Sequence, residues 1–322
     1  MKGTDMLKYF AKRILWMIPI VICVALLIFS LMRLIPGDPA RMLVSRDATE
    51  EEYLNKRVEL GLDEPFLTQL GKFLTDTFLH FDFGKSYMTK TSISRDIGPR
   101  MVRTMELGLL AAAFAMITGI LLGITAATHV KKWQDSLCMI IALVGISMPA
   151  FWAALLLIML FSVKLQLLPP SGIGGIQYYI LPAISVGLYG TATFARQIRS
   201  SMLDVIGSDY VTTARSKGLT EREVIYKHAL PNALIPTITI IGGFLGQMFG
   251  GSIVIETIFS IPGMGLYLIT GINNRDYPVV QTCVILLSII FCIAMLLVDL
   301  AYAMVDPRIK ARYASSKVKR NK

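Results

Sequence analysis

Six long apolar stretches are the feature of this sequence that most restricts its fold. Each is long enough to cross the hydrocarbon core of a bilayer, which takes about 20 residues of α-helix. They lie at residues 14–32, 105–127, 137–163, 179–195, 235–260 and 280–305. Of the 322 residues, 54% are hydrophobic and only 17% are charged, which is too few charges to cover a soluble fold of this size. The sequence therefore predicts an all-α, polytopic membrane protein with six transmembrane helices.

Two of the stretches carry residues that disturb a helix. The fourth, 179–195, is the shortest and contains one proline and two glycines. Such residues are tolerated in a membrane when neighbouring helices satisfy the freed backbone groups. In the third stretch, Ser147 and Pro149 predict a kink. The first stretch is too long for a signal peptide and lacks a small-residue cleavage site, so we expect it to stay as a first helix.

The basic residues segregate to alternate loops. Segments 1–13, 128–136, 196–234 and 306–322 carry 4, 2, 6 and 7 Lys and Arg, whereas the short loops 164–178 and 261–279 carry one each. Because cytoplasmic loops are enriched in Lys and Arg, this asymmetry predicts that both termini are cytoplasmic. The net charge of +10 is therefore explained by membrane topology, and a nucleic-acid-binding surface is not expected.

The long outer segment is predicted to contain helical pieces near 47–61 and 65–80. A capping box of Asp47 and Glu50 opens the first piece, and Gly61 ends it. The second piece carries apolar residues at helical spacing. This stripe either packs on the helix bundle or lies on the outer membrane surface, and packing is the preferred interpretation.

The cytoplasmic loop 196–234 has the most informative local sequence. Residues 199–217 are predicted to form a helix, and Gly218 supplies the residue that ends it. Thr220 and Glu223 then form a capping box that opens a second short helix. A helix at this surface either inserts into a groove on a soluble partner or lies on lipid headgroups. The sequence physics leaves these two alternatives open.

Residues 209–219 and 228–234 resemble the EAA loop of ATP-binding-cassette importer permeases, most closely the dipeptide, oligopeptide and nickel class. The family pattern is Glu-Ala-Ala, three residues, Gly, and after nine more residues Ile-x-Leu-Pro. This chain retains Ala214, Gly218, Leu230 and Pro231, and it has Thr212, Thr213 and His228 in place of the Glu, the first Ala and the Ile. Further matches follow in the family's order at 33–39, 59–63, 83–86, 256–265, 275–281 and 306–308.

The resemblance implies a type I ABC importer fold in a bacterial or archaeal inner membrane, with three parts. These are a first helix with an extracytoplasmic segment (1–103), a five-helix permease core with the coupling loop (104–305), and a basic cytoplasmic tail (306–322). The residues expected to couple the core to an ATPase are Ala214, Lys217, Gly218, Leu219, Thr220, Glu223, Leu230 and Pro231.

The function implied is import of di- or oligopeptides or related small solutes, driven by ATP and dependent on a binding protein. Such a permease forms half of the pathway by alternating access. The expected partners are a second homologous permease, two cytoplasmic ATPases, an extracytoplasmic substrate-binding protein and the lipid bilayer. The chain itself is expected to be no enzyme and to hold no cofactor, because ATP and Mg bind the ATPases. A stand-alone secondary transporter or channel is the alternative.

Acidic residues inside the stretches need a reason, because burying a charge in the bilayer is costly. We expect Glu106 to pair with Arg103, and Asp299 to pair with a nearby Lys or Arg. For Glu256, a role in the translocation pathway and a structural hydrogen-bonding role are equally supported. The predicted pathway residues are Gln247, Ser252 and Glu256.

Catalytic and metal chemistry has no support in the sequence. The three histidines fall on separate topological segments, and the four cysteines have no metal-like spacing. The Gly-Lys-Ser at 84–86 lacks the earlier glycine of a phosphate-binding loop, because position 79 is leucine.

Overall fold

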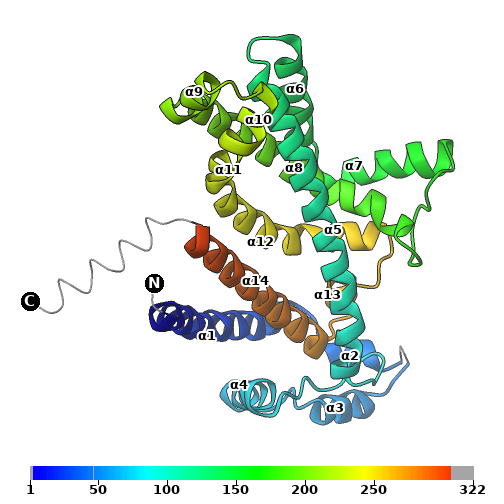
Figure 1. Ribbon diagram of the computed structural model, residues 1–322. Helices are drawn as coiled ribbons and strands as arrows, with labels where there is room; N and C mark the ends of the chain where they lie inside the picture. The colour runs from blue at the N-terminus through cyan, green and yellow to red at the C-terminus, as the bar shows by residue number, and fades with distance from the viewer. Residues whose placement is uncertain (1–2, 46, 306–322) are drawn as a thin grey trace, which may run out of the picture.

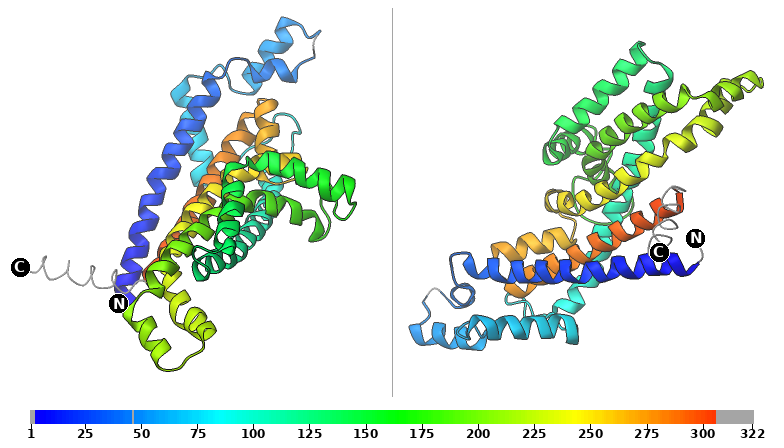
Figure 2. Two further views of the ribbon diagram at one scale, coloured as in Figure 1. Left: turned by 90° about the horizontal axis from the view of Figure 1, so that it is seen from above. Right: turned by 90° about the vertical axis from the view of Figure 1, so that its left-hand side faces the viewer.

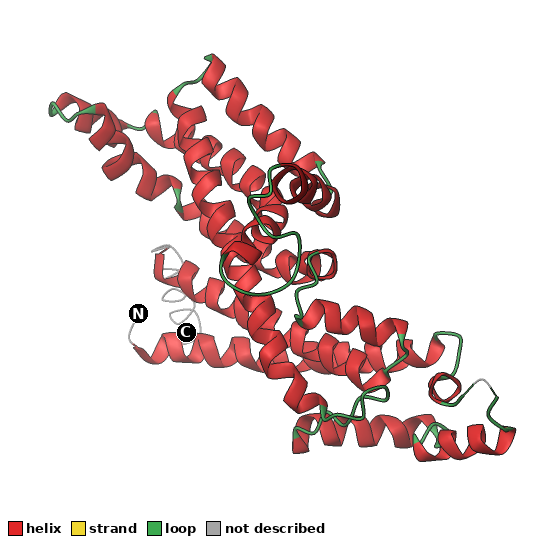
Figure 3. Ribbon diagram, turned by 90° about the vertical axis from the view of Figure 1, so that its right-hand side faces the viewer, coloured by secondary structure: helices red, strands yellow, loops and turns green. Residues whose placement is uncertain are grey.

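The computed structural model describes residues 3–45 and 47–305, and this part of the chain is built from helices without a β-strand (Figures 1 and 3). The N-terminal part contains α1 (Gly3–Leu34), α2 (Pro39–Leu43), α3 (Glu50–Glu59), α4 (Phe66–Thr75) and the π-helical η1 (Asp76–His80). The remainder contains α5 (Ile93–Thr128), α6 (Trp133–Ser147), α7 (Ala150–Leu157), η2 (Ile158–Lys164), α8 (Gln177–Ile206), α9 (Asp209–Ser216), α10 (Glu221–Glu223), η3 (Val224–Ala229), α11 (Leu230–Ala233), α12 (Ile235–Ile258), α13 (Met264–Asn273) and α14 (Tyr277–Val305).

Three of these helices are long and apolar enough to cross a membrane by themselves within the described residues. They are Phe10–Leu34 of α1, Ile93–Thr128, and Tyr277–Leu300 of α14. Helices α8 and α12 cover the fourth and fifth predicted stretches, and each is continuous. The total of six spans stays a prediction, and the predicted tail, 306–322, lies outside the described residues.

The third predicted stretch, 137–163, is not one continuous helix, and its crossing of the membrane as a single span stays a prediction. Helices α6 and α7 are bent by 107° relative to one another (Figure 1). Pro149 has no N–H to continue the helix, and a proline pushes the residue before it toward extended backbone. Met148 accordingly has φ −89° and ψ 121°. The expected kink at Ser147 and Pro149 is therefore a complete break.

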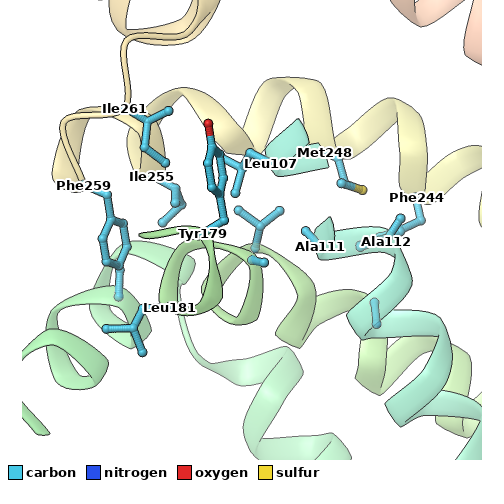
Figure 4. Close-up of a cluster of buried hydrophobic side chains, with 14 of the residues drawn as sticks. Leu107, Ala111, Ala112, Tyr179, Leu181, Phe244, Met248, Ile255, Phe259 and Ile261 are labelled. Atoms are coloured by element: carbon cyan, nitrogen blue, oxygen red, sulfur yellow. The ribbon is translucent and has the colours of Figure 1, made fainter. Parts of the chain in front are cut away.

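Helices α5 and α8 pack closely enough to form the centre of the core. A Cβ atom on Gly123 of α5 would lie 2.8 Å from the carbonyl oxygen of Ala195 on α8, so only glycine fits there. Small residues at such contacts let membrane helices approach. On the outer side of this contact, Leu107 and Ala111 of α5 lie in the main cluster of buried side chains, which residues of α8 and α12 complete (Figure 4).

Helices α1 and α14 lie side by side (Figures 1 and 2). Arg13 Nη1 lies 2.9 Å from Asp299 Oδ2, so the predicted pairing of Asp299 is confirmed. Glu106 likewise accepts from Arg103 at 3.0 Å, as expected. The contact at Arg13 brings the beginning of α1 beside the end of α14, as expected for termini on one side of the membrane.

The outer segment forms helices near both predicted positions. The first predicted piece corresponds to α3, which begins at a capping box of Thr49 and Glu52, so the predicted box of Asp47 and Glu50 is wrong by two residues. The second predicted piece corresponds to α4 and η1, and it packs on the bundle, in agreement with the preferred interpretation of its apolar stripe. The ring of Phe73 stacks on that of Phe29 of α1, with 5.2 Å between their centroids.

Candidate functional site

The loop 196–234, which is predicted to be cytoplasmic, folds into a helical hairpin that extends from the end of α8 (Figures 1 and 2). The predicted single helix over 199–217 is wrong, because α8 ends at Ile206 and α9 begins at Asp209, with Gly207 between them. The inner faces of the hairpin pack against each other and on the ends of α5 and α8. The buried residues of this cluster are Ile124, Ala127, Ile198, Met202, Val211, Ala214, Val224, Ile225, Ala229 and Ala233.

The tip of the hairpin has the predicted turn. Gly218 has φ +79°, a conformation that side chains other than glycine rarely adopt. Thr220 accepts a hydrogen bond from the N–H of Glu223, and the Glu223 side chain accepts one from the N–H of Thr220. This capping box is the one expected from the sequence. The turn and the helix start are therefore fixed by local contacts.

The eight predicted coupling residues differ in exposure, with Glu223 half-buried in the capping box and Pro231 exposed on α11. Lys217, Gly218, Leu219 and Thr220 are exposed at the tip, where a partner can reach them. Ala214 is buried, and Leu230 is half-buried against the same cluster, so these two hold the hairpin together. Their functional role stays a prediction.

Two contacts across the hairpin were not foreseen. Arg215 donates to both carboxylate oxygens of Glu221, at 3.1 and 2.8 Å, so the pair spans the glycine turn. The hydrogen bonds from Arg215 hold the pKa of Glu221 below its ordinary value. Asn232 Nδ2 donates to the hydroxyl of Tyr210 at 2.8 Å. In the sequence, the positions of Arg215 and Glu221 on either side of the glycine turn could have indicated the first of these two contacts.

Glu256 lies in an enclosed hydrogen-bond network, and its exposed fraction is 0%. Its carboxylate accepts from Thr104 Oγ1 at 2.8 Å and from the N–H groups of Gly265 and Leu266 at 2.7 and 3.1 Å. Thr104 in turn accepts from the N–H of Met264 at 2.8 Å. These three N–H groups lie in the first turn of α13, where backbone N–H groups have no partner within the helix. The network therefore caps α13 and ties it to α5 and α12.

This geometry bears on the predicted pathway residues. Ser252 is buried one turn before Glu256 and hydrogen bonds to its carboxylate. The side chain of Gln247 lies outside the described part of the chain. The contacts favour the structural role of Glu256 in this conformation, and its pathway role stays a prediction.

A cavity of about 360 Å³ lies at the break between α6 and α7. Residues 146–150 line one side of it, and α8 and α12 supply the other walls. The sequence predicted the kink at Ser147 and Pro149 but not a cavity, because its other walls come from residues far along the chain.

Within 3–45 and 47–305, no group of His, Cys, Asp and Glu could hold a metal ion. Ser86 of the Gly-Lys-Ser sequence is buried and donates to Asp276 at 2.5 Å. Asp276 also accepts from the N–H of Tyr87 at 3.0 Å, so this segment anchors the outer part of the chain to the start of α14.

Two family models match the chain over most of its length. Residues 119–311 match the family described as binding-protein-dependent transport system inner membrane component, and residues 6–108 match the N-terminal model of the same component. The chain belongs to this family. It is thus the inner-membrane permease component of a binding-protein-dependent ABC importer.

Relatives with curated names agree with this assignment. The permease is 41% identical over 305 residues to the glutathione transport system permease protein GsiC of Salmonella typhimurium, covering 95% of this chain and 99% of the relative. It is also 41% identical over 307 residues to a putative peptide transport system permease protein of Brucella abortus, covering 93% and 98%.

A solved structure shares the fold. The permease resembles the crystal structure of an amino acid ABC transporter with histidines, with a TM-score of 0.51 and 14% sequence identity. The likeness covers 66% of this chain and 94% of that one, and at this identity it supports the fold alone.

Proposed function

We propose that the permease imports short peptides or related small solutes such as glutathione, and that it forms one half of the pathway beside a second, homologous permease. A binding protein delivers the substrate from outside, and two ATPases that hold ATP and Mg drive the cycle. The named relatives support the substrate class, since both are permeases of glutathione or peptide transport systems. No cofactor is assigned to this chain.

The single observation that carries the coupling mechanism is the exposed glycine turn of the hairpin. Its tip, Lys217–Thr220, is free of the bundle, whereas the rest of the hairpin packs on α5 and α8. A force on the tip is therefore transmitted to two core helices. Closing of the ATPase dimer would move the tip and rock the core between inward- and outward-facing states.

The test uses the permease assembled with its second permease, ATPases and binding protein in lipid vesicles. Gly218→Val forces a β-branched side chain into φ +79°, and we expect it to abolish peptide uptake while membrane insertion continues. Gly207→Val is the matched control, because Gly207 has φ −81° and a Cβ atom added there would have only the Leu203 carbonyl oxygen within 4 Å. We expect this control to retain most of its uptake.

A second variant separates loss of docking from loss of loop structure. Leu219→Asp leaves the turn unstrained and places a charge on the exposed tip. We expect the ATPases to stop copurifying with it. Normal copurification together with normal substrate-stimulated ATP hydrolysis in both tip variants would refute the coupling role. Uptake that needs no ATPase would refute the importer mechanism itself.

A further inference from the structure

The cavity at the break between α6 and α7 is the strongest unassigned feature of the permease. Pro149 cannot donate to the carbonyl of Gly145, so the helical ladder of an otherwise apolar segment is interrupted there, whereas the N–H of Met148 still donates to the Val144 carbonyl at 3.1 Å. Irregular backbone at membrane depth is tolerated where it is buried in protein or lines a water-filled cavity. The cavity lies beside this break.

The exposure of the lining residues gives the cavity a direction. Ser147 and Tyr189 are exposed and form the rim. Ser185, Phe244 and Met248 are 1%, 6% and 3% exposed and form the floor. The ring of Phe244 meets that of Phe194 edge-on, with 5.3 Å between centroids, which fixes one side of the floor. The cavity is therefore a pocket that opens at the hydroxyl groups of Ser147 and Tyr189 and closes on a mostly apolar floor, where the Ser185 hydroxyl donates to the Leu181 carbonyl of its own helix.

The chemistry of the walls restricts what the pocket holds. None of the ten described residues that line it is charged. An ammonium or carboxylate group placed there would lose its hydration without a partner, at a cost of several kcal/mol. The hydroxyl groups of Ser147 and Tyr189 at the rim suit the amide groups of a substrate instead. The thioethers of Met148 and Met248 adapt to apolar side chains of different shapes.

The volume agrees with a small occupant. Pockets for small ligands span about 300–1,000 Å³, and about 360 Å³ is at the low end. This space suits one or two side chains with their backbone. A longer peptide would pass through it in steps.

We infer that this pocket is the intramembrane chamber that holds the uncharged part of the substrate, an inference that rests on the proposed function. It takes a side chain and adjoining amide groups of a short peptide, while the charged termini stay outside its rim. The methionines make it tolerant of side-chain shape, and the absence of charged residues from its lining makes it intolerant of side-chain charge. The permease therefore contributes a selection by charge that is separate from the choice made by the binding protein.

The first test blocks the pocket after the complex has folded. Ser147→Cys is assembled with its partners in vesicles and treated with a bulky methanethiosulfonate reagent. Ser136→Cys, exposed on the same helix α6 and three turns away, is the matched control, and the unaltered chain treated in the same way is the reference. We expect modification at position 147 to lower dipeptide uptake at least tenfold, and modification at position 136 to leave it unchanged. Unchanged uptake after complete modification at position 147 would overturn the inference.

The second test changes the charge of the floor. Met248→Glu is compared with Met248→Leu for uptake of Ala-Phe, Ala-Glu and Ala-Lys. We expect the unaltered chain and the leucine variant to import Ala-Phe at least tenfold faster than either charged peptide. We expect the glutamate variant to lower the Ala-Glu to Ala-Lys uptake ratio at least tenfold. An unchanged ratio in the glutamate variant would overturn the inference. Failure of the unaltered complex to import any of the three peptides would instead refute the proposed substrate class.

Discussion

The network around Glu256 gives the most direct test of how the core is held together. Thr104→Val removes one hydroxyl and keeps the shape of the side chain, so no cavity is created. Thr104 is 1% exposed, and its hydroxyl donates to Glu256 and accepts from the N–H of Met264. The variant therefore loses one bond to a carboxylate and leaves one buried backbone donor without a partner.

The expected loss follows from these two contacts. A hydrogen bond to a charged group contributes about 1.5–3 kcal/mol, and an unsatisfied buried donor costs about 1–3 kcal/mol. Allowing for partial relaxation, we expect a destabilisation of about 2–4 kcal/mol. At about 2–4 °C per kcal/mol for a protein of this size class, the melting temperature should fall by about 4–16 °C.

The assay is thermal unfolding of the detergent-solubilised permease, followed by fluorescence-detected size exclusion. Thr125→Val is the matched control, because Thr125 lies on the same helix, is exposed, and donates only to the carbonyl of Leu121 one turn earlier. We expect the control to change stability by at most about 0.5 kcal/mol. Equal melting temperatures for the Thr104 and Thr125 variants would refute the assignment of the network as a structural anchor.

Two further predictions concern other contacts. Gly123→Ala should destabilise the permease by about 1–3 kcal/mol, because the added Cβ atom would clash with the Ala195 carbonyl oxygen. Gly98→Ala on the same helix is the control, because a Cβ atom added there would have no neighbour within 4 Å. Equal thermal stability of the two variants would contradict this packing. Arg215 lowers the pKa of Glu221, so their contact stabilises the loop at every pH above the ordinary pKa of a glutamate. This stabilisation is lost only as the pH falls through the lowered pKa of Glu221. Amide hydrogen exchange at the loop tip, corrected for intrinsic pH dependence, should therefore be constant from about pH 8 to about pH 6, and a rise within that window would contradict the pair.

The features that the sequence predicted correctly depend on neighbours along the chain. Gly218 forms the turn and Thr220 caps the next helix because each makes its contacts within a few residues. Pro149 interrupts the third stretch for the same reason, since the lost donor and the clash are local. The errors were also local. Thr49 caps α3 where Asp47 was expected, because several residues there are able to cap a helix.

Sequence alone therefore determined the helical membrane class and the shape of the turn at Gly218, since length, apolarity and capping are properties of single segments. Only the tertiary structure decided the surroundings of Glu256, whose partner Thr104 is 152 positions away. It also decided the cavity, because Ser147, Tyr189 and Phe244 come from separate helices. Contacts of this kind depend on how closely helices approach and at what angle, and this is set by the packing of the whole bundle.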